Sequence, residues 1–378
     1  MTATHTTPAT PTADAFAERI FTSALATAEF MSIYLGERLG WYRTLADDGP
    51  LTADDLAART GTAARYAREW LEMQAAYGIL DVDAADDPAR FGIAPGVAEV
   101  LTDGSSLNYL GELPRIFAAP FTRLPQLLEA YRRGGGVGWG DLGDDAREAQ
   151  AALNRPWFEQ RLAADLARVD HLHRRMSLPR ARILDIGCGG GHSTVALARA
   201  YPDATVVGVD IDEQSVQMAR RHAAAAGVAD RVRLRCGDAA QVAADGPFDA
   251  AFAFECLHDL PRPVEVLGAV RAALHPGCSL IVMDEAVSSE FTSPAGEVDR
   301  LMYGFSVFVC LPDSMSTAGS AATGTVMRPA TVAEYAHAAG FGEVRALPID
   351  GFAFFRFYEL STHWHIPGSI ALRQFATQ

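Results

Sequence analysis

The chain contains no lysine, because all 32 of its basic side chains are arginines. Mechanisms that need a lysine amine are therefore excluded, among them Schiff-base chemistry and phosphate binding by a P-loop lysine. Against 32 basic side chains stand 47 acidic ones, for a formal net charge of −15. This excess of negative charge argues against a nucleic acid or an anionic membrane as the main partner.

Cysteines are few, and long apolar runs are missing. The five cysteines form no C-x-x-C pair, so we expect a reducing cytoplasm and no disulfide framework or zinc ribbon. Residues 1–14 lack the basic start and apolar core of a signal peptide, and no apolar stretch approaches the roughly 18 residues of a membrane span. With 49% hydrophobic residues the chain can build a large core. We predict a soluble cytoplasmic protein with a disordered tail over residues 1–14.

Residues 15–103 have the pattern of a winged-helix domain that is mainly helical. Thr52 is placed as the N-cap of a short helix, Gly61 interrupts the helical pattern, and a second helix follows up to Gly78. A short apolar stretch after it predicts a strand. Helix, turn, helix and strand in this order are the outline of a winged helix.

Two functions are open for this domain. A winged helix that reads DNA presents a positively charged second helix to the phosphates. Here the second helix balances Arg65 and Arg68 against Glu69 and Glu72. This balance favours a packing module that forms a homodimer, and leaves a DNA-binding transcriptional regulator as the alternative.

The rest of the chain divides into a helical part and an α/β part. Residues 104–180 are mostly helical with a glycine-rich interruption, and we interpret them as a linker and substrate lid. Over residues 181–378, apolar strands alternate with helices, which predicts a Rossmann-like, doubly wound parallel sheet. The predicted strands are residues 183–186, 205–209, 232–235, 250–254 and 279–283.

A glycine-rich loop follows the first of these strands. It comes directly after Asp185 and contains four glycines, which let a ligand approach the backbone at the carboxyl edge of a sheet. The dinucleotide-binding fingerprint requires Gly or Ala where this chain has His192, so that fingerprint is absent.

Carboxylates at the ends of the next two strands narrow the class of cofactor. Asp210 ends the second strand, where it can accept both hydroxyls of a ribose. Asp238 ends the third strand and is placed to accept an adenine amino proton. These charges would repel a pyrophosphate, whereas they would attract a cofactor that carries a sulfonium, an α-amino group and a ribose.

Together the motifs resemble those of class I S-adenosylmethionine-dependent methyltransferases. D-x-G-x-G-x-G from Asp185, V-D at 209–210, G-D-A at 237–239 and F-D at 248–249 have the order and spacing of that family. The resemblance implies S-adenosyl-L-methionine as the cofactor. The residues expected to bind it are Asp185, Gly187, Gly189, Gly191, Asp210, Ile211, Gly237, Asp238, Ala239 and Glu255.

The whole chain also resembles the winged-helix small-molecule methyltransferases, which include plant-type O-methyltransferases and a bacterial group. N-R-P-W-F from Asn154 and M-Y-G-F-S from Met302 fit the bacterial group. The resemblance implies a homodimer through the winged helix and a small-molecule acceptor, such as a secondary metabolite. Whether oxygen, nitrogen or carbon is methylated stays open.

Acidic and histidine side chains are the candidates for catalysis. His258 follows the fourth strand, where plant-type O-methyltransferases place an H-D pair containing their base, so the resemblance makes His258 the candidate general base. The alternative is that His258 only caps or packs its loop. Glu255, Asp284 and Glu285 are candidates to orient this histidine or a polar substrate, and the register leaves open which of Asp284 and Glu285 does so.

Aromatic residues are the candidates for an apolar substrate cavity, with ordinary core packing as the alternative for each. They are Trp157, Phe158, Tyr303, Phe305 and Phe308. Histidine pairs spaced two residues apart do not share a helix face, and no carboxylate or cysteine spacing completes a ligand set. We therefore expect no metal.

Overall fold

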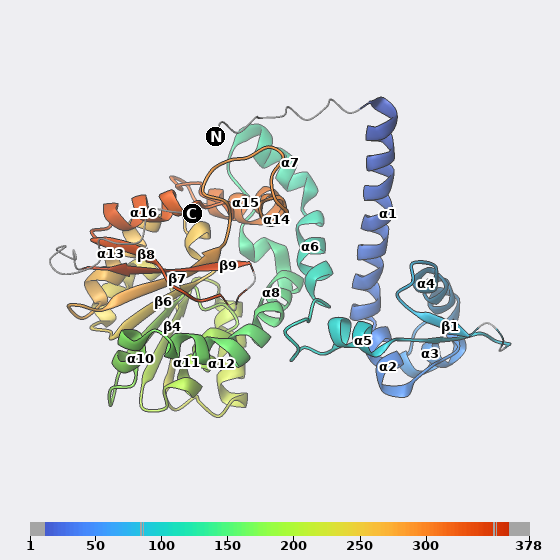
Figure 1. Ribbon diagram of the computed structural model, residues 1–378, viewed down its shortest axis with the longest axis horizontal. Coiled ribbons are helices and arrows are strands. Elements are labelled where there is room, and N and C mark those ends of the chain that lie inside the picture. The colour runs from blue at the N-terminus through green and yellow to red at the C-terminus, as the bar shows by residue number, and fades with distance from the viewer. Residues whose placement is uncertain (1–11, 84, 86, 351, 353, 363–378) are drawn as a thin grey trace, which may run out of the picture. The chain divides into compact units, whose positions relative to one another are not determined.

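A computed structural model describes residues 12–83, 85, 87–350, 352 and 354–362 (Figure 1). The chain divides into two compact units, residues 1–118 and 119–378. The division falls inside the segment of residues 104–180 that we interpreted as a linker. The first part of that segment therefore packs with the N-terminal unit, and the remainder packs with the sheet.

The N-terminal unit has the predicted order of elements. Thr52 caps its helix by accepting a hydrogen bond from the Asp55 N–H at 3.2 Å, and Gly61 ends that helix in the left-handed conformation. A two-stranded antiparallel sheet forms the wing. The elements are α1 (Ala13–Arg38), α2 (Trp41–Asp48), α3 (Ala53–Thr60), α4 (Ala64–Ala76), β1 (Asp81–Asp83), β2 (Arg90–Gly92), α5 (Pro95–Thr102) and α6 (Leu113–Phe121), which runs into the second unit.

Helix α4 does not present a positive surface. Its Arg65 is paired with Glu69 across a distance of 2.5 Å, one helical turn away. This pair cancels half of the positive charge that α4 would offer to a phosphate backbone. The DNA-binding alternative is therefore not favoured.

A seven-stranded sheet forms the centre of the second unit, in the order β5-β4-β3-β6-β7-β9-β8. The five predicted strands are present and parallel. The predicted doubly wound sheet is confirmed, and two further strands extend it, with β9 lying antiparallel between β7 and β8. The strands are β3 (Arg182–Ile186), β4 (Thr205–Asp210), β5 (Val232–Cys236), β6 (Ala250–Phe254), β7 (Ser279–Glu285), β8 (Glu343–Ala346) and β9 (Phe355–Ser361).

Helices cover both faces of this sheet, as a doubly wound fold requires (Figure 1). Helices α10, α11 and α12 lie on one face, and α13 and α16 lie on the other. The remaining elements precede the first strand or connect the later ones. In chain order the second unit contains α7 (Leu124–Arg133), η1 (Trp139–Leu142), α8 (Gly143–Trp157), η2 (Phe158–Leu162), α9 (Ala163–Ala167), α10 (Asp170–Met176), α11 (His192–Ala200), α12 (Glu213–Ala225), η3 (Ala239–Asp245), η4 (Leu257–Asp259), α13 (Pro263–Ala273), α14 (Glu297–Phe305), η5 (Ser306–Cys310), α15 (Leu311–Met315) and α16 (Pro329–Ala338).

Among the described residues, no helix combines the length and the hydropathy needed to span a membrane.

Candidate active site

The glycine loop joins β3 to α11 with left-handed backbone at Gly187, Gly189 and Gly191. A Cβ at Gly187 would lie 2.6 Å from the Cβ of Cys256, and one at Gly191 would lie 2.6 Å from the Cβ of Ala219. At Gly187 and Gly191 glycine is therefore required for two reasons, the left-handed backbone conformation and the close packing. At Gly189 a Cβ would meet nothing within 4 Å, so this is where the loop leaves room for a ligand.

Asp185 binds the first turn of the helix that follows the glycine loop. Its carboxylate is fully buried and accepts hydrogen bonds from the hydroxyls of Ser193 and Thr194 at 2.7 and 2.6 Å. Burial raises the pKa of Asp185 to about 6, although the two hydroxyl groups lower it. This residue, which we predicted to bind the cofactor, therefore fixes the start of α11 beneath the loop.

Asp210 ends β4 beside the glycine loop. Its two carboxylate oxygens accept hydrogen bonds from the backbone N–H groups of Gly189 and Asp212, at 2.8 and 2.9 Å. Each oxygen keeps acceptor capacity for one ribose hydroxyl. The next side chain, Ile211, is 77% exposed, as expected of an apolar surface that a flat ring covers.

Arginines pair with two of the acids at this edge, although the sequence showed no obvious cationic partner there. Arg147 on α8 makes a bidentate contact with Asp212, at 2.7 and 3.3 Å. Arg262 lies 3.1 Å from the carboxylate of Asp238, the predicted adenine contact. Asp238 also accepts a hydrogen bond from the N–H of Ala240 and so caps η3, which begins at Ala239.

Glu255 follows β6 directly, in a left-handed backbone conformation (φ 49°) that strains a residue with a Cβ. Its carboxylate accepts hydrogen bonds from the side chains of Gln150, at 3.0 Å, and Asn154. Burial raises the pKa of Glu255 to about 7, and the Asn154 hydrogen bond opposes that rise. The side-chain amides of α8 therefore hold this carboxylate in a strained position.

His258 is buried at the centre of a carboxylate cluster. Its Nδ1 lies 2.7 Å from an oxygen of Asp284 and 3.1 Å from one of Glu285, and its Nε2 lies 3.4 Å from Asp259. Both residues left open by the register thus contact the imidazole, and Asp284 makes the hydrogen bond. An Nδ1 proton shared with Asp284 leaves Nε2 as the nitrogen available for chemistry.

The charges of this cluster set its protonation. Burial alone would lower the pKa of His258, but the carboxylates of Asp259, Asp284 and Glu285 outweigh it and raise that pKa well above the ordinary value. Although burial opposes it, the imidazole holds the pKa of Asp284 below the usual range. Burial keeps the pKa of Glu285 well above its usual range.

The loop that carries His258 is packed against the cofactor loop. Cys256 contacts Gly187 and donates a hydrogen bond from its thiol to the carbonyl of Ile186 at 3.3 Å. The backbone carbonyl of His258 accepts from the N–H of Gly324 at 3.2 Å. These contacts hold the loop of His258 in place. Cys256, two residues before His258 in the chain, is the residue that touches the glycine loop.

The five aromatic candidates do not form one cavity wall. Phe158 is 6% exposed and packs edge-on against Phe254 within the core. Trp157 packs beside it against Phe352, whereas Phe305 and Phe308 belong to a separate apolar cluster around α8 and η5. Tyr303 accepts a hydrogen bond from Arg328. The alternative of core packing therefore describes Phe158, which does not face an open site.

Sequence reasoning missed the polar face of α8. Arg147, Gln150 and Asn154 are spaced as i, i+3 and i+7 and lie on one side of the helix, where they contact Asp212 and Glu255. Polar residues at helical spacing in the helical segment that precedes the sheet were a signal that could have revealed them. Two π-helical turns, η2 and η5, lie in the segments that flank this site, as is frequent at functional sites.

Comparison with known families agrees with the two predicted domains. Residues 178–310 match a family described as a methyltransferase domain, and residues 26–103 match one described as an Rv2258c-like winged HTH domain. A curated relative, the ubiquinone biosynthesis O-methyltransferase of Xylella fastidiosa (strain M23), is 34% identical over 120 residues, which are 32% of this chain and 48% of that protein. The chain thus spans about half the length of such relatives.

Solved structures resemble the chain over nearly its full length. The mitomycin 7-O-methyltransferase MmcR has a TM-score of 0.66 and 22% identity, covering 92% of this chain and 98% of its own. PigF with SAH has a TM-score of 0.68 and 19% identity, covering 91% of this chain and 99% of its own. At these identities the likeness shows the fold, with a winged-helix domain before a methyltransferase domain.

Proposed function

We propose that this chain, an S-adenosylmethionine-dependent methyltransferase with an N-terminal winged-helix domain, methylates an oxygen atom of a small-molecule acceptor. The observation that carries the proposal is the pairing of a ribose-binding edge with a buried histidine. Asp210 and the open side of Gly189 lie at that edge, and His258 sits in the loop packed against it.

The residues of the cofactor edge fit the proposed cofactor. The backbone-held carboxylate of Asp210 is placed for two ribose hydroxyls, and the exposed side chain of Ile211 for the face of an adenine. When bound, S-adenosylmethionine supplies a methyl group on a sulfonium. The acidic residues of this edge favour a cationic ligand over an anionic one.

His258 would remove the acceptor's proton. Asp284 accepts a hydrogen bond from the Nδ1–H group and orients the imidazole. The Nε2 lone pair then takes the proton of an acceptor hydroxyl as the oxygen attacks the methyl group. The charge of Asp284 then stabilises the imidazolium that forms. An acceptor that must lose a proton, such as a phenol, gains most from this arrangement, which is why we favour oxygen.

A panel of phenolic small molecules and methyl-labelled S-adenosylmethionine test the function, with methylated products identified by mass spectrometry. We expect S-adenosylhomocysteine and an O-methylated product to form in equal amounts. The variant Asp210→Ala serves as the control for cofactor binding. Cofactor binding without transfer to any phenol, amine or small-molecule extract would contradict the proposal.

We also propose that the chain forms a homodimer through its N-terminal unit. In α1, large apolar side chains are 45–65% exposed at Phe16, Ile20, Phe21 and Leu25. The same unit contains a groove of about 600 Å³ lined mainly by apolar side chains, among them Leu35 and Trp70. Apolar surface of this extent is typical of a site that another chain covers, and symmetric dimers are the commonest assembly.

Light scattering of the full chain at micromolar concentration tests the assembly. We expect twice the mass of one chain, and loss of the dimer when Phe16 and Phe21 are both replaced by glutamate. A matched double change to glutamine of Glu265 and Glu297, two exposed residues of the second unit, should leave the mass unchanged. A monomeric wild-type protein would refute the homodimer.

A further inference from the structure

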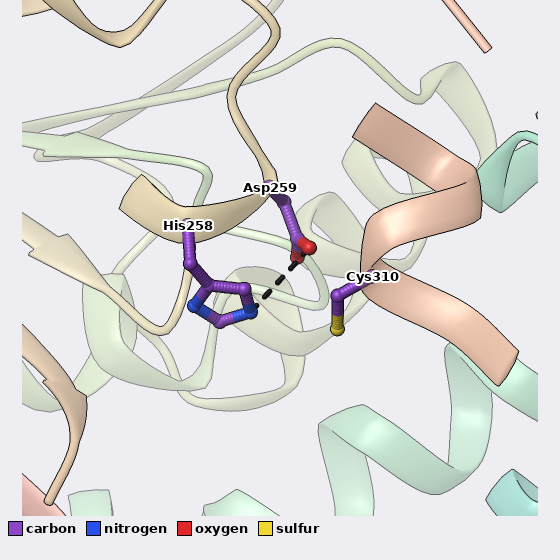
Figure 2. A group of neighbouring side chains, drawn as sticks. All are labelled: His258, Asp259 and Cys310. Atoms are coloured by element: carbon purple, nitrogen blue, oxygen red, sulfur yellow. Dashed lines mark ion pairs between the residues drawn. The ribbon is translucent and has the colours of Figure 1, made fainter. Parts of the chain in front are cut away.

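A second set of side chains meets at the other nitrogen of His258. Its Nε2 faces the carboxylate of Asp259, and the side chain of Cys310 lies beside this pair (Figure 2). Their potential ligand atoms all lie within 4.8 Å of one another. His258 and Asp259 come from η4, whereas Cys310 comes from the π-helical turn η5.

We propose that His258 Nε2, Asp259 and Cys310 form a binding site for a divalent transition-metal ion, best matched by Zn²⁺, and that an ion bound there blocks the general base. Imidazole nitrogen, carboxylate oxygen and thiolate sulfur are the three donor types that zinc prefers. Three protein ligands leave a fourth position for water, as in accessible zinc sites.

The distances fit a tetrahedral ion. Zinc bonds of ~2.0–2.1 Å to nitrogen and oxygen place those two ligand atoms about 3.3 Å apart. The distance from His258 Nε2 to Asp259 Oδ1 is 3.4 Å. This Asp259 oxygen is buried, and the groups that approach the carboxylate are the imidazole of His258 and the thiol of Cys310. A thiolate needs about 3.6 Å to each of the other ligands, so the Cys310 side chain has only a short distance to move.

Asp284 supplies the outer contact that a metal-binding histidine uses. Its Oδ1 accepts a hydrogen bond from Nδ1–H, with 2.7 Å between the two heavy atoms, and so directs Nε2 toward Asp259 and Cys310. The carboxylates of Asp284 and Glu285 form a second possible ligand group with Nδ1. The direct hydrogen bond between Nδ1 and Asp284 leaves no space for an ion there, so the thiol side is the better site.

From the sequence we expected no metal. The ligands of the proposed site come from two segments that are far apart in the chain, so no ligand spacing marks them. When an ion binds, the Nε2 proton of His258 and the thiol proton of Cys310 pass to solvent, and the sulfur binds as a thiolate. The Nε2 lone pair is then occupied and cannot take a proton from an acceptor. Inhibition by the metal rests on the proposed function, whereas binding of the metal does not.

Titration of the full chain with Co²⁺, after treatment with EDTA, tests the site. We expect a thiolate-to-cobalt absorption band that one equivalent of Zn²⁺ abolishes. Cys310→Ala should remove the band, and Asp284→Asn should weaken Co²⁺ binding about 10–100-fold. The matched control is Cys278→Ser, which changes a buried cysteine elsewhere and should keep the band. Calorimetry with S-adenosylhomocysteine checks that each variant is folded.

Absence of the band in the wild-type protein overturns the metal site, and so does a band that survives in Cys310→Ala. If Cys310→Ala does not fold, Asp259→Asn takes its place and should weaken Co²⁺ binding while keeping the thiolate band. A second measurement follows methyl transfer with added Zn²⁺, which should inhibit reversibly. A band without inhibition keeps the metal site but overturns the blocked base, and a band without any methyl transfer contradicts the proposed function alone.

Discussion

The cofactor edge and the cluster around His258 both concentrate carboxylates, but they satisfy them differently. At the cofactor edge, Asp210 accepts two backbone N–H groups, and Asp212 is bound by an arginine. Around His258, three carboxylates approach a single imidazole, and oxygens of Asp284 and Glu285 have no hydrogen-bond partner among the described residues. The acids at the cofactor edge are therefore held mainly by backbone N–H groups and an arginine, although one buried oxygen of Asp185 has no hydrogen-bond partner among the described residues. The acids around His258 share one imidazole instead.

This difference separates binding from chemistry. Backbone donors are fixed by the fold, so the cofactor edge keeps its geometry whatever the protonation of nearby groups. A cluster of side chains that share one imidazole changes its charge with each proton it gains or loses. Perturbed groups of this kind concentrate where protons are transferred. Changes in the His258 cluster should therefore affect the rate, and changes at the cofactor edge should affect affinity.

The largest expected effect comes from His258→Ala. General-base catalysis is typically worth about 10²–10⁴ in rate, so kcat should fall by that factor. The affinity for S-adenosylmethionine should stay within about twofold of wild type, since the cofactor edge is intact. Steady-state kinetics and calorimetry measure the two quantities. His337→Ala, a change on the exposed side of α16, is the control. If cofactor affinity fell by the same factor as the rate, the division into a binding region and a catalytic region would be wrong.

The pH dependence follows from the same cluster. Because the carboxylates raise the pKa of His258 above its ordinary value, the imidazole is protonated at neutral pH and only its deprotonated form is a base. Activity should therefore rise as the pH passes upward through that raised pKa. His258→Ala should lack this rise. Profiles of kcat against pH for both proteins provide the measurement, and a profile that falls over the same range would reverse the assignment.

The next effect in size is that of Asp210→Ala on cofactor binding. Hydrogen bonds to charged groups contribute about 1.5–3 kcal/mol, so the Kd for S-adenosylmethionine should rise about 10–150-fold. The methylation rate at saturating cofactor should change much less. Asp230→Ala, whose side chain is 76% exposed on a turn, is the matched control. If calorimetry showed undiminished affinity, Asp210 would not be a ligand of the cofactor.

The sequence predicted the five parallel strands and the glycine loop, because both depend on local patterns. Apolar runs mark buried strands, and a loop that needs positive φ needs glycine, as at Gly187 and Gly191. The strands β8 and β9 were missed: β8 is short and half exposed, so it carries no apolar run.

The site was predicted only where a motif marks it. Asp210 ends β4 and His258 lies in the loop after β6, and parallel topology brings such positions to one edge of a sheet. Arg147 and Cys310 lie on helices outside that rule, so only the tertiary structure brings them to the site. The same limit applies to the aromatic candidates. The sequence alone cannot distinguish an aromatic residue that lines a cavity from one that packs in the core, as Phe158 does.

The smallest predicted effect tests whether α8 belongs to the cofactor edge. Arg147 is nearly buried and joins α8 to Asp212, which in turn caps α12 next to Asp210, the proposed ribose ligand. Replacing Arg147 with methionine keeps the apolar stem but removes the fork, and should raise the Kd for S-adenosylmethionine about three- to tenfold through a less ordered Asp212. Lysine at this position should recover little, because it cannot make the bidentate contact. Arg174→Met on the exposed side of α10 is the control. If Arg147→Met instead lowers kcat at saturating cofactor and leaves Kd unchanged, α8 acts on the His258 cluster through Gln150 and Asn154. Helix α8 would then belong with the catalytic cluster and not with the cofactor edge.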